Sequence, residues 1–427
     1  MENVFKNRNF RLTFFGALVS NVGALFYSFA VSFYILEITG NNAFLQGLYL
    51  ALCGAIQLLF TPIGGVLGDR LHKGKIMFVC DYLKGGVILL ATVAMLLLRE
   101  PGAHLVILFA AGILGNAISG IFSPASGALL PHIVEEQQLQ QANSYFSVMN
   151  SLQYIIGVVL AGVLYAALPI HLLFLIVGVC YVASGISEMF IRYAHQPKEG
   201  KLTLKTALGD FGDGLKYIKT QKALLAMMLA ILFINFFFAP ITSNFIPFFI
   251  KTDVAGAEHY LFDSFLKPEL WSSVLSVVIG LSSMIAALVL STRTQAEKVG
   301  RRVSWLLLAE AAILSCLTVG YWILVKRGVS LNAFLLAMTF GCLLSGVTVV
   351  NINIPVDTAL MRIVDKDKLS KINSVISISS HGLIPIASVL AGAILQTMGS
   401  TILLLFCTVG FLVTALMLLF NRKAKEI

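Results

Sequence analysis

The sequence predicts an all-α integral membrane protein in which twelve transmembrane helices form two pseudo-symmetric six-helix bundles. Of its 427 residues, 58% are hydrophobic and only 12% are charged, whereas a soluble chain carries about 25% charged residues. Apolar runs of about 20 residues, enough to cross ~30 Å of hydrocarbon, occur at twelve places. Short motifs also recur at one fixed distance, which indicates two copies of one unit.

The apolar runs begin near residues 11, 43, 76, 105, 145, 170, 223, 271, 303, 331, 373 and 401. The repeated motifs, each displaced by 230 positions, are Leu160-Ala161-Gly162 with Leu390-Ala391-Gly392, Asn143-Ser144 with Asn373-Ser374, and Ile133-Val134 with Ile363-Val364. Duplicated apolar chains of this kind are typical of secondary transporters, whose substrate site lies between the repeats.

The distribution of Lys and Arg predicts the orientation of the chain in the membrane. With the N-terminus inside, the inner segments hold 24 of the 30 basic residues and the outer segments hold five, while Lys84 lies within a span. This bias places both termini in the cytoplasm. The net charge of +9 then reflects topology and proximity to anionic membrane lipids, and no nucleic-acid partner is expected. The first apolar run is expected to be an uncleaved helix.

The longest polar interruption divides the chain into an N-terminal bundle over 1–193, a cytoplasmic linker over 194–222 and a C-terminal bundle over 223–427. Within the linker, apolar residues recur at steps of three and four, which predicts an amphipathic helix on the inner membrane surface or against the inner ends of the bundle. These residues are Leu204, Leu208, Phe211, Leu215 and Ile218. The composition of the outer loop over 251–270 indicates no role.

Enzyme and metal chemistry find no support in the sequence. The six cysteines are dispersed singly and no CxxC pair or His spacing suits a metal,. The chain contains no GxxxxGK[ST], GxSxG or HExxH pattern. We therefore expect no enzyme activity, no cofactor and no resident metal, and we expect transport to draw on a gradient rather than on ATP.

The sharpest local motif follows the second apolar run, where glycines allow close backbone approach before a very short basic turn. An Asp near a helix N-terminus and an Arg able to clasp a partner carboxylate predict a latch that holds the two halves together in one state only. The latch residues are Gly65, Gly68, Asp69, Arg70, Lys73 and Lys75.

This segment resembles the Gly-x-Leu-Ala-Asp-Arg motif between helices two and three of the major facilitator superfamily. The glycine that usually stands two places after the Arg is replaced by His72. The corresponding loop of the second half keeps Gly300-Arg301-Arg302 but has no Asp. The resemblance therefore implies an asymmetric latch.

Three further stretches narrow the resemblance to the macrolide-efflux branch of drug:proton antiporters in that superfamily. They are 7–11 with 36–40, 123–125 with 130–144, and 214–218. The resemblance covers nearly the whole chain and is specific for fold and branch but weak for substrate. One departure is the segment from Gly157 to Gly162, which lacks the Gly-Pro pair that antiporters of this superfamily often carry in helix five.

The resemblance implies that spans one, four, seven and ten line a central cavity. These spans carry neutral polar residues among aromatic ones and no ionised side chain near mid-depth, a combination that suits a bulky amphiphilic ligand. The candidates are Asn21, Tyr27, Ser28, Asn116, Asn235, Asn244, Asn351 and Asn353. The alternative is that these groups only join helices by hydrogen bonds.

Ionisable residues inside spans are candidates for proton coupling. Glu310 lies about 12 Å into its span, at ~1.5 Å per residue, with no cation at i±3 or i±4. The resemblance implies that span nine is peripheral, so a bond from Glu310 to a neighbouring group is the alternative. His381 is a second candidate, with a neutral hydrogen-bonded histidine as the alternative. Asp81 and Glu188 are further candidates, although Lys84 and Arg192 follow them at i+3 and i+4 and self-contained ion pairs are the favoured interpretation.

These observations predict a monomeric secondary transporter of a bacterial-type plasma membrane that exports amphiphilic or hydrophobic small molecules by proton antiport and alternating access. Two alternatives stay open. One is a flippase for lipids or lysophospholipids, and the other is a non-transporting membrane sensor or scaffold.

Overall fold

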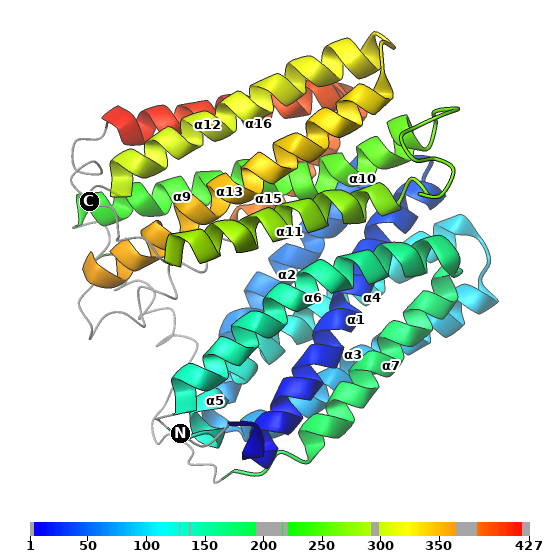
Figure 1. Cartoon of the computed structure of the whole chain (residues 1–427). Helices are drawn as coiled ribbons and strands as arrows, with labels where there is room; N and C mark the ends of the chain where they lie inside the picture. The colour runs from blue at the N-terminus through cyan, green and yellow to red at the C-terminus, as the bar shows by residue number, and fades with distance from the viewer. Residues whose placement is uncertain are drawn as a thin grey trace. The chain divides into compact units, whose positions relative to one another are not determined.

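The computed structural model describes residues 4–193 without 128, 136 and 137, residue 216, and residues 221–291, 299–363 and 382–420. This part of the chain is helical and contains no β-strand (Figure 1). Ten helices are long and apolar enough to cross a membrane, and two shorter apolar helices, Gly157–Ala167 and Ile384–Thr397, complete twelve spans among the described residues. The prediction of a twelve-helix integral membrane protein is confirmed.

The spans of the first half are α1 (Arg8–Ile38), α2 (Ala43–Arg70), α3 (Lys73–Leu97), α4 (Pro101–Gly127), α6 (Leu139–Ala167) and α7 (Ile170–Met189), with the short helix α5 (Leu130–Ile133) between α4 and α6. The spans of the second half are α9 (Lys222–Pro240) continued by α10 (Ile246–Phe249), α11 (Leu270–Ser291), α12 (Val299–Gly320), α13 (Leu331–Ile363), α15 (Ile384–Thr397) and α16 (Ser400–Phe420). π-helical turns occur at Ile241–Phe245, Ile250–Val254 and Tyr321–Lys326.

Local sequence explains where several helices begin and end. The Asn7 side chain caps α1 by accepting hydrogen bonds from the backbone N–H groups of Asn9 and Phe10 at 2.9 and 3.3 Å,. The same helix ends before Gly40, whose φ of 63° is a left-handed conformation that glycine adopts readily,. Pro101 begins α4, where its missing N–H leaves no helical hydrogen bond unmade,.

By its contacts the chain divides into two compact units, Met1–Gly40 with Leu52–Ala207 and Asn41–Ala51 with Leu208–Ile427. The start of α2 belongs to the second unit because the Ala43 N–H donates to Gln396 Oε1 at 3.0 Å and Gln46 Nε2 donates to the Ser243 carbonyl at 3.3 Å. The boundaries at 193 and 222 stay a prediction.

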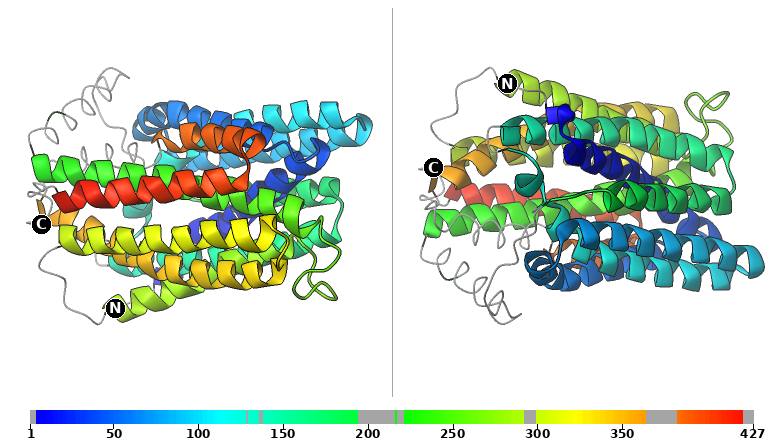
Figure 2. Two further views of the ribbon diagram at one scale, coloured as in Figure 1. Left: turned by 90° about the horizontal axis from the view of Figure 1, so that it is seen from above. Right: turned by 90° about the horizontal axis from the view of Figure 1, so that it is seen from below.

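Helix pairs correspond between the units. In the first unit α3 packs on α4 and α7, and α1 packs on α6 and α7; in the second unit α12 packs on α13 and α16, and the α9 segment packs on α15 and α16. Two further views show the helices of each unit running lengthwise beside one another (Figure 2). The apolar core of the second unit includes Leu307 on α12, Ile352 on α13 and Phe411 on α16. The prediction of two pseudo-symmetric bundles is confirmed.

Some predictions fall on residues outside this description. They are the amphipathic helix of the linker, the start of span eleven near residue 373, and His381.

Candidate functional site

The first unit contains a polar cavity of about 280 Å³. Its lining comes from α1, α2, α3, α4 and α7, and combines hydroxyl and amide groups with two aromatic rings. The residues are Ser20, Asn21, Ala24, Gln57, Lys84, Ser119, Phe122, Ser123, Ser126 and Tyr181. The volume is that of a small-molecule site rather than of one or two buried waters.

Lys84 brings a cationic group to this cavity. Its side chain is only 8% exposed, and its ammonium lies 4.5 Å from the ring centroid of Phe122 on α4 and 5.4 Å from that of Tyr181 on α7. Both rings stabilise the cation through their π faces. The expectation that no ionised side chain stands near mid-depth concerned spans one, four, seven and ten. The lysine reaches this cavity from span three, which that expectation did not consider.

Two buried carboxylates lie near Lys84, outside the cavity lining. Asp81 and Glu188 are 0% and 1% exposed, and none of their four oxygens has a hydrogen-bond partner among the described residues. Ser184 donates instead to the Gly16 carbonyl at 2.9 Å. Neither expected pair, Asp81 with Lys84 or Glu188 with Arg192, forms an ion pair within 4.0 Å, because the lysine turns to the aromatic rings and Glu188 packs against Gly16.

The second unit places Glu310 in a different setting. Its carboxylate, 1% exposed, accepts hydrogen bonds from the hydroxyls of Ser345 at 2.6 Å and Thr348 at 2.5 Å, both on α13. Glu310 borders a cavity of only about 30 Å³ lined mostly by Phe, Leu, Ile and Met side chains, which is room for about one or two waters. No cation forms an ion pair with it in the described chain.

Four of the eight predicted cavity residues donate hydrogen bonds to backbone carbonyls. Asn116 and Asn235 donate to carbonyls one turn earlier in their own helices, at 2.8 and 2.9 Å. Asn244 is buried and donates to the Ser388 carbonyl at 3.3 Å. Asn351 accepts from Arg302 at 2.6 Å and donates to its own helix.

The remaining candidates differ among themselves. Asn21 lines the cavity of the first unit and donates to Gln153 Oε1 at 3.4 Å. The Tyr27 ring packs against Phe174 with centroids 5.2 Å apart. Ser28 and Asn353 are exposed. The assignment of substrate contacts among these residues stays a prediction.

The latch segment differs from the expected loop. α2 continues through Asp69 and Arg70, so that only Leu71 and His72 separate it from α3. His72 fills the N-cap of α3, where its ring accepts from the Lys75 N–H at 3.4 Å and packs against Tyr193. The departure at His72 therefore supplies a helix cap. The role of the side chains of Asp69 and Arg70 stays a prediction.

Close packing in this segment falls on a neighbouring glycine. A Cβ at Gly65 would meet nothing within 4 Å and one at Gly68 would make only ordinary contacts with Ala125. A Cβ at Gly64 would lie 2.6 Å from the Gly120 carbonyl on α4. Gly64 is thus the position where α2 and α4 require glycine. At the start of α3, Lys73 donates its backbone N–H to the Tyr193 hydroxyl at 2.8 Å.

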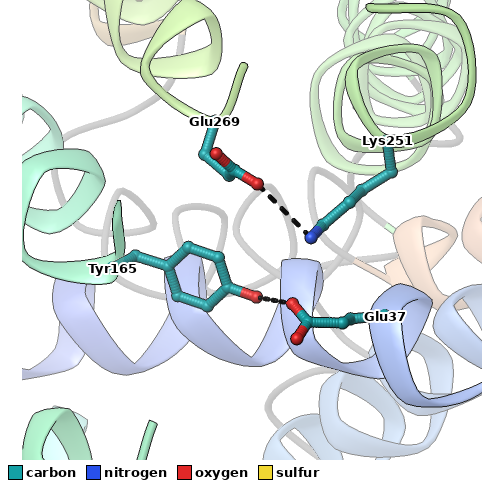
Figure 3. Close-up of polar contacts among 4 residues, drawn as sticks. All are labelled: Glu37, Tyr165, Lys251 and Glu269. Carbon is teal, nitrogen blue, oxygen red and sulfur yellow. Dashed lines mark hydrogen bonds and ion pairs between the residues drawn. The ribbon is translucent and has the colours of Figure 1, made fainter. Parts of the chain in front are cut away.

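Each unit also carries a polar pair near the ends of its helices, and Figure 3 draws both. In the first unit the Tyr165 hydroxyl donates to Glu37 at 2.8 Å. In the second unit Lys251 and Glu269 form an ion pair at 3.4 Å. In the loop over 255–269, a hydrogen bond from His259 lowers the pKa of the Asp263 carboxyl.

Sequence reasoning missed the cavity of the first unit but not all of its residues. Ser119, Ser123 and Ser126 recur at i, i+4 and i+7, a spacing that puts three hydroxyls on one face of α4,. That spacing could have indicated a polar surface. The approach of Lys84 depends on how α3 packs against α4 and α7 and has no sequence signature. Among the described residues, no group of three His, Cys, Asp or Glu side chains could hold a metal.

Comparison with known proteins assigns this fold to a family. The Major Facilitator Superfamily profile matches residues 13–384. The chain belongs to the Major Facilitator Superfamily. It is a multi-pass membrane transporter by family. Over 403 residues it is 23% identical to an uncharacterized transporter of this superfamily, YvqJ of Bacillus subtilis (strain 168), covering 93% of this chain and 88% of that one.

Other relatives match over a shorter range. Macrolide efflux protein A of Streptococcus pyogenes is 25% identical over 248 residues, 56% of this chain and 59% of the relative. A further Bacillus subtilis (strain 168) transporter of the superfamily, YkuC, is 24% identical over 55% of each chain. The chain thus matches little more than half the length of these two relatives.

Solved structures agree on the fold. A bacterial homologue of the iron transporter ferroportin in an inward-facing state superposes with a TM-score of 0.71, at 15% identity over 98% of this chain and 99% of that one. The nucleoside transporter NupG gives a TM-score of 0.73 at 10% identity over 97% and 99%. At these identities the likeness concerns the fold alone.

Proposed function

We propose that this superfamily member exports amphiphilic or hydrophobic small molecules by proton antiport, as a monomer in a bacterial-type plasma membrane with both termini in the cytoplasm. Alternating access would occur by movement of one bundle against the other. Two named relatives support the direction of transport, macrolide efflux protein A and the putative bacilysin exporter BacE of Bacillus subtilis, which is 28% identical over 199 residues.

The observation that carries proton coupling is Glu310. A carboxylate that is 1% exposed inside a span is costly to keep ionised unless a cation or several donors compensate it. Here two hydroxyls supply one hydrogen bond to each oxygen. Hydroxyl oxygens can also accept the proton of a neutral carboxyl group, so the site serves both protonation states without rearrangement of the helices.

The decisive experiment measures efflux in proteoliposomes against a panel of macrolides, hydrophobic cations and lysolipids, with and without a pH gradient. Glu310→Gln should abolish gradient-driven transport while sparing expression, because the amide cannot exchange the proton yet keeps the shape. Glu310→Asp is the matched variant that retains a carboxyl group and should retain part of the gradient response. Unchanged transport by Glu310→Gln would refute coupling at this residue.

The proposed latch is part of the same cycle. Gly65, Gly68, Asp69, Arg70, Lys73 and Lys75 would hold the inner ends of the helices in one state only. The coupling roles of Asp81 and Glu188 are a secondary proposal, supported by their burial without hydrogen-bond partners in the described chain.

A lipid or lysophospholipid flippase is the second candidate, because neutral polar groups among aromatic ones would also suit an amphiphilic lipid. Altered leaflet distribution of a labelled lipid in the same vesicles would support it. A non-transporting sensor would show no flux of any compound in the panel.

A further inference from the structure

We propose that the polar cavity of the first unit binds an anionic group of the transported amphiphile, with Lys84 as the cation that recognises it. The inference rests on the proposed export function, because it takes the bound compound to be the transported one, but the binding itself can be measured without a gradient. It narrows the substrate class from amphiphilic or hydrophobic small molecules to amphiphiles that carry a carboxylate or phosphate.

The ammonium of Lys84 has unused hydrogen-bonding capacity. An ammonium group has three donors and no acceptor. In the part of the chain that is described, this ammonium makes contacts with two ring faces and no hydrogen bond or ion pair with an oxygen. Aromatic faces stabilise its charge but leave its N–H groups without acceptors. An anionic ligand, or water in its absence, would supply them.

The composition of the cavity also favours an anion. Among the described residues that line it, Lys84 is the only Lys, Arg, Asp or Glu, and the other polar groups are hydroxyls, amides and the Tyr181 phenol. Ser119 and Ser123, with the amide of Asn21, can donate to a carboxylate or phosphate oxygen. A positive group surrounded by neutral donors is the arrangement expected of an anion site.

Two carboxylates and a thiol that are near Lys84 affect its charge. The charged and titratable neighbours are Asp81, Glu188 and the Cys80 thiol, and Asp81 and Glu188 lie outside the lining. Two carboxylates buried without donors cannot both be kept ionised cheaply beside one ammonium. Neutralisation of one or both leaves the positive charge of Lys84 available to the cavity. A carboxylate that stays ionised would compensate the cation when no ligand is bound.

The test is a binding measurement on the purified full chain with a matched pair of fluorescent probes, N-dansyl-phenylalanine and its uncharged primary amide. The wild-type protein should bind the acid about tenfold or more tightly than the amide, the size expected for a hydrogen bond to a charged group. Lys84→Met should remove this preference and keep the affinity for the amide. Lys84→Arg should keep most of the preference because it preserves the charge.

Retained binding of the amide by Lys84→Met shows that this variant is folded, and Lys84→Arg keeps the proposal testable if it is not. Lys326→Met, which removes a cation from an outer helix end of the second unit, is the charge-matched control and should leave the preference intact. Displacement of the acid probe by phenylacetate or by phenyl phosphate, but not by phenylacetamide, would support the proposal and distinguish carboxylate from phosphate ligands.

Equal binding of acid and amide by the wild-type protein, or a preference that survives Lys84→Met, would overturn the inference. Because these measurements use no pH gradient, they fail or succeed independently of the export assay. A chain that binds the acid probe through Lys84 but moves no compound would refute the proposed function and leave the anion site standing.

Discussion

Lys84 in the first unit and Glu310 in the second stand on the third span of their units and carry opposite charges. Lys84 and Glu310 lie 226 positions apart, as do Ser119 and Ser345, Gly120 and Gly346, and Phe122 and Thr348, whereas the repeated motifs lie 230 positions apart. In both units the charged residue comes from the third span and faces the fourth. Lys84 lies over Phe122 beside a cavity of about 280 Å³, whereas Glu310 accepts from Ser345 and Thr348 beside one of about 30 Å³.

The two units share a helix arrangement, and a few side chains determine the different chemistry of each. A phenyl ring opposite the charged residue suits a cation, and a hydroxyl at the same place suits a carboxylate. The first unit thereby gains a polar cavity and the second a compact hydrogen-bonded acid. The division of labour that we propose, ligand recognition in one unit and proton exchange in the other, follows from that exchange of side chains.

The largest loss of stability is expected at the close helix contacts that both units contain. A Cβ at Gly120 would lie 2.6 Å from the Gln57 carbonyl, and one at Gly346 would lie 2.6 Å from the Ile279 carbonyl. Backbone cannot move aside cheaply, so Gly120→Val and Gly346→Val should each destabilise their unit by about 3 kcal/mol or more. Melting of the purified variants, followed by size-exclusion chromatography, measures this.

Gly115→Val is the control for these substitutions, because it lies on the same helix as Gly120 and its Cβ would meet nothing within 4 Å. A mild effect at Gly120 together with a severe one at Gly346 would break the proposed equivalence of the two helix pairs.

The next effect concerns the two buried carboxylates near Lys84, which differ from Glu310 in having a buried cation near them. Asp81→Asn or Glu188→Gln leaves one carboxylate near Lys84, while the double variant leaves none. The double variant should therefore lose more stability than the sum of the single ones, by about 0.5 to 3 kcal/mol. Unfolding in mixed detergent micelles measures the four proteins of the cycle. Strict additivity would show that the two carboxylates do not share Lys84.

A smaller effect concerns the hydroxyl groups that face each charged residue. Ser345→Ala and Thr348→Ala each remove one hydrogen bond to Glu310 and should each cost about 1 to 3 kcal/mol, depending on whether the acceptor is charged. Ser119→Ala, at the position that corresponds to Ser345, borders the open cavity, where water can replace the hydroxyl, and should cost less. The same unfolding assay compares the three. An equal loss at Ser119 would contradict the difference between the units.

The smallest effect is expected at the two polar pairs of Figure 3. Glu269→Gln removes a partly exposed ion pair and should cost at most about 1 kcal/mol,. Tyr165→Phe removes a neutral donor to Glu37 and should cost a similar amount,. Added salt should weaken the contribution of Glu269 and leave that of Tyr165 nearly unchanged, because only the former depends on two charges. If added salt changed the two stability losses equally, this distinction between the pairs would be wrong.

The sequence by itself determined the membrane class, the twelve spans and the duplication, because hydropathy and repeated motifs are properties of the chain read in order. It also singled out Glu310, since a lone acid in a long apolar run is costly wherever the helix packs. The family followed from motifs that the profile match over residues 13–384 bears out. The predicted span starts lie within six residues of the observed ones for the eleven helices whose beginnings are described.

Only the tertiary structure decided which helices meet, and that changed the meaning of particular side chains. Lys84 and Asp81 share one helix face at i and i+3, which predicted an ion pair, yet packing of α3 against α4 and α7 turns the lysine toward two rings and a cavity. Glu310 likewise finds its two donors, Ser345 and Thr348, on α13 rather than on its own helix. Partners from separate helices come together only when the bundle is packed, so no spacing along one helix can reveal them.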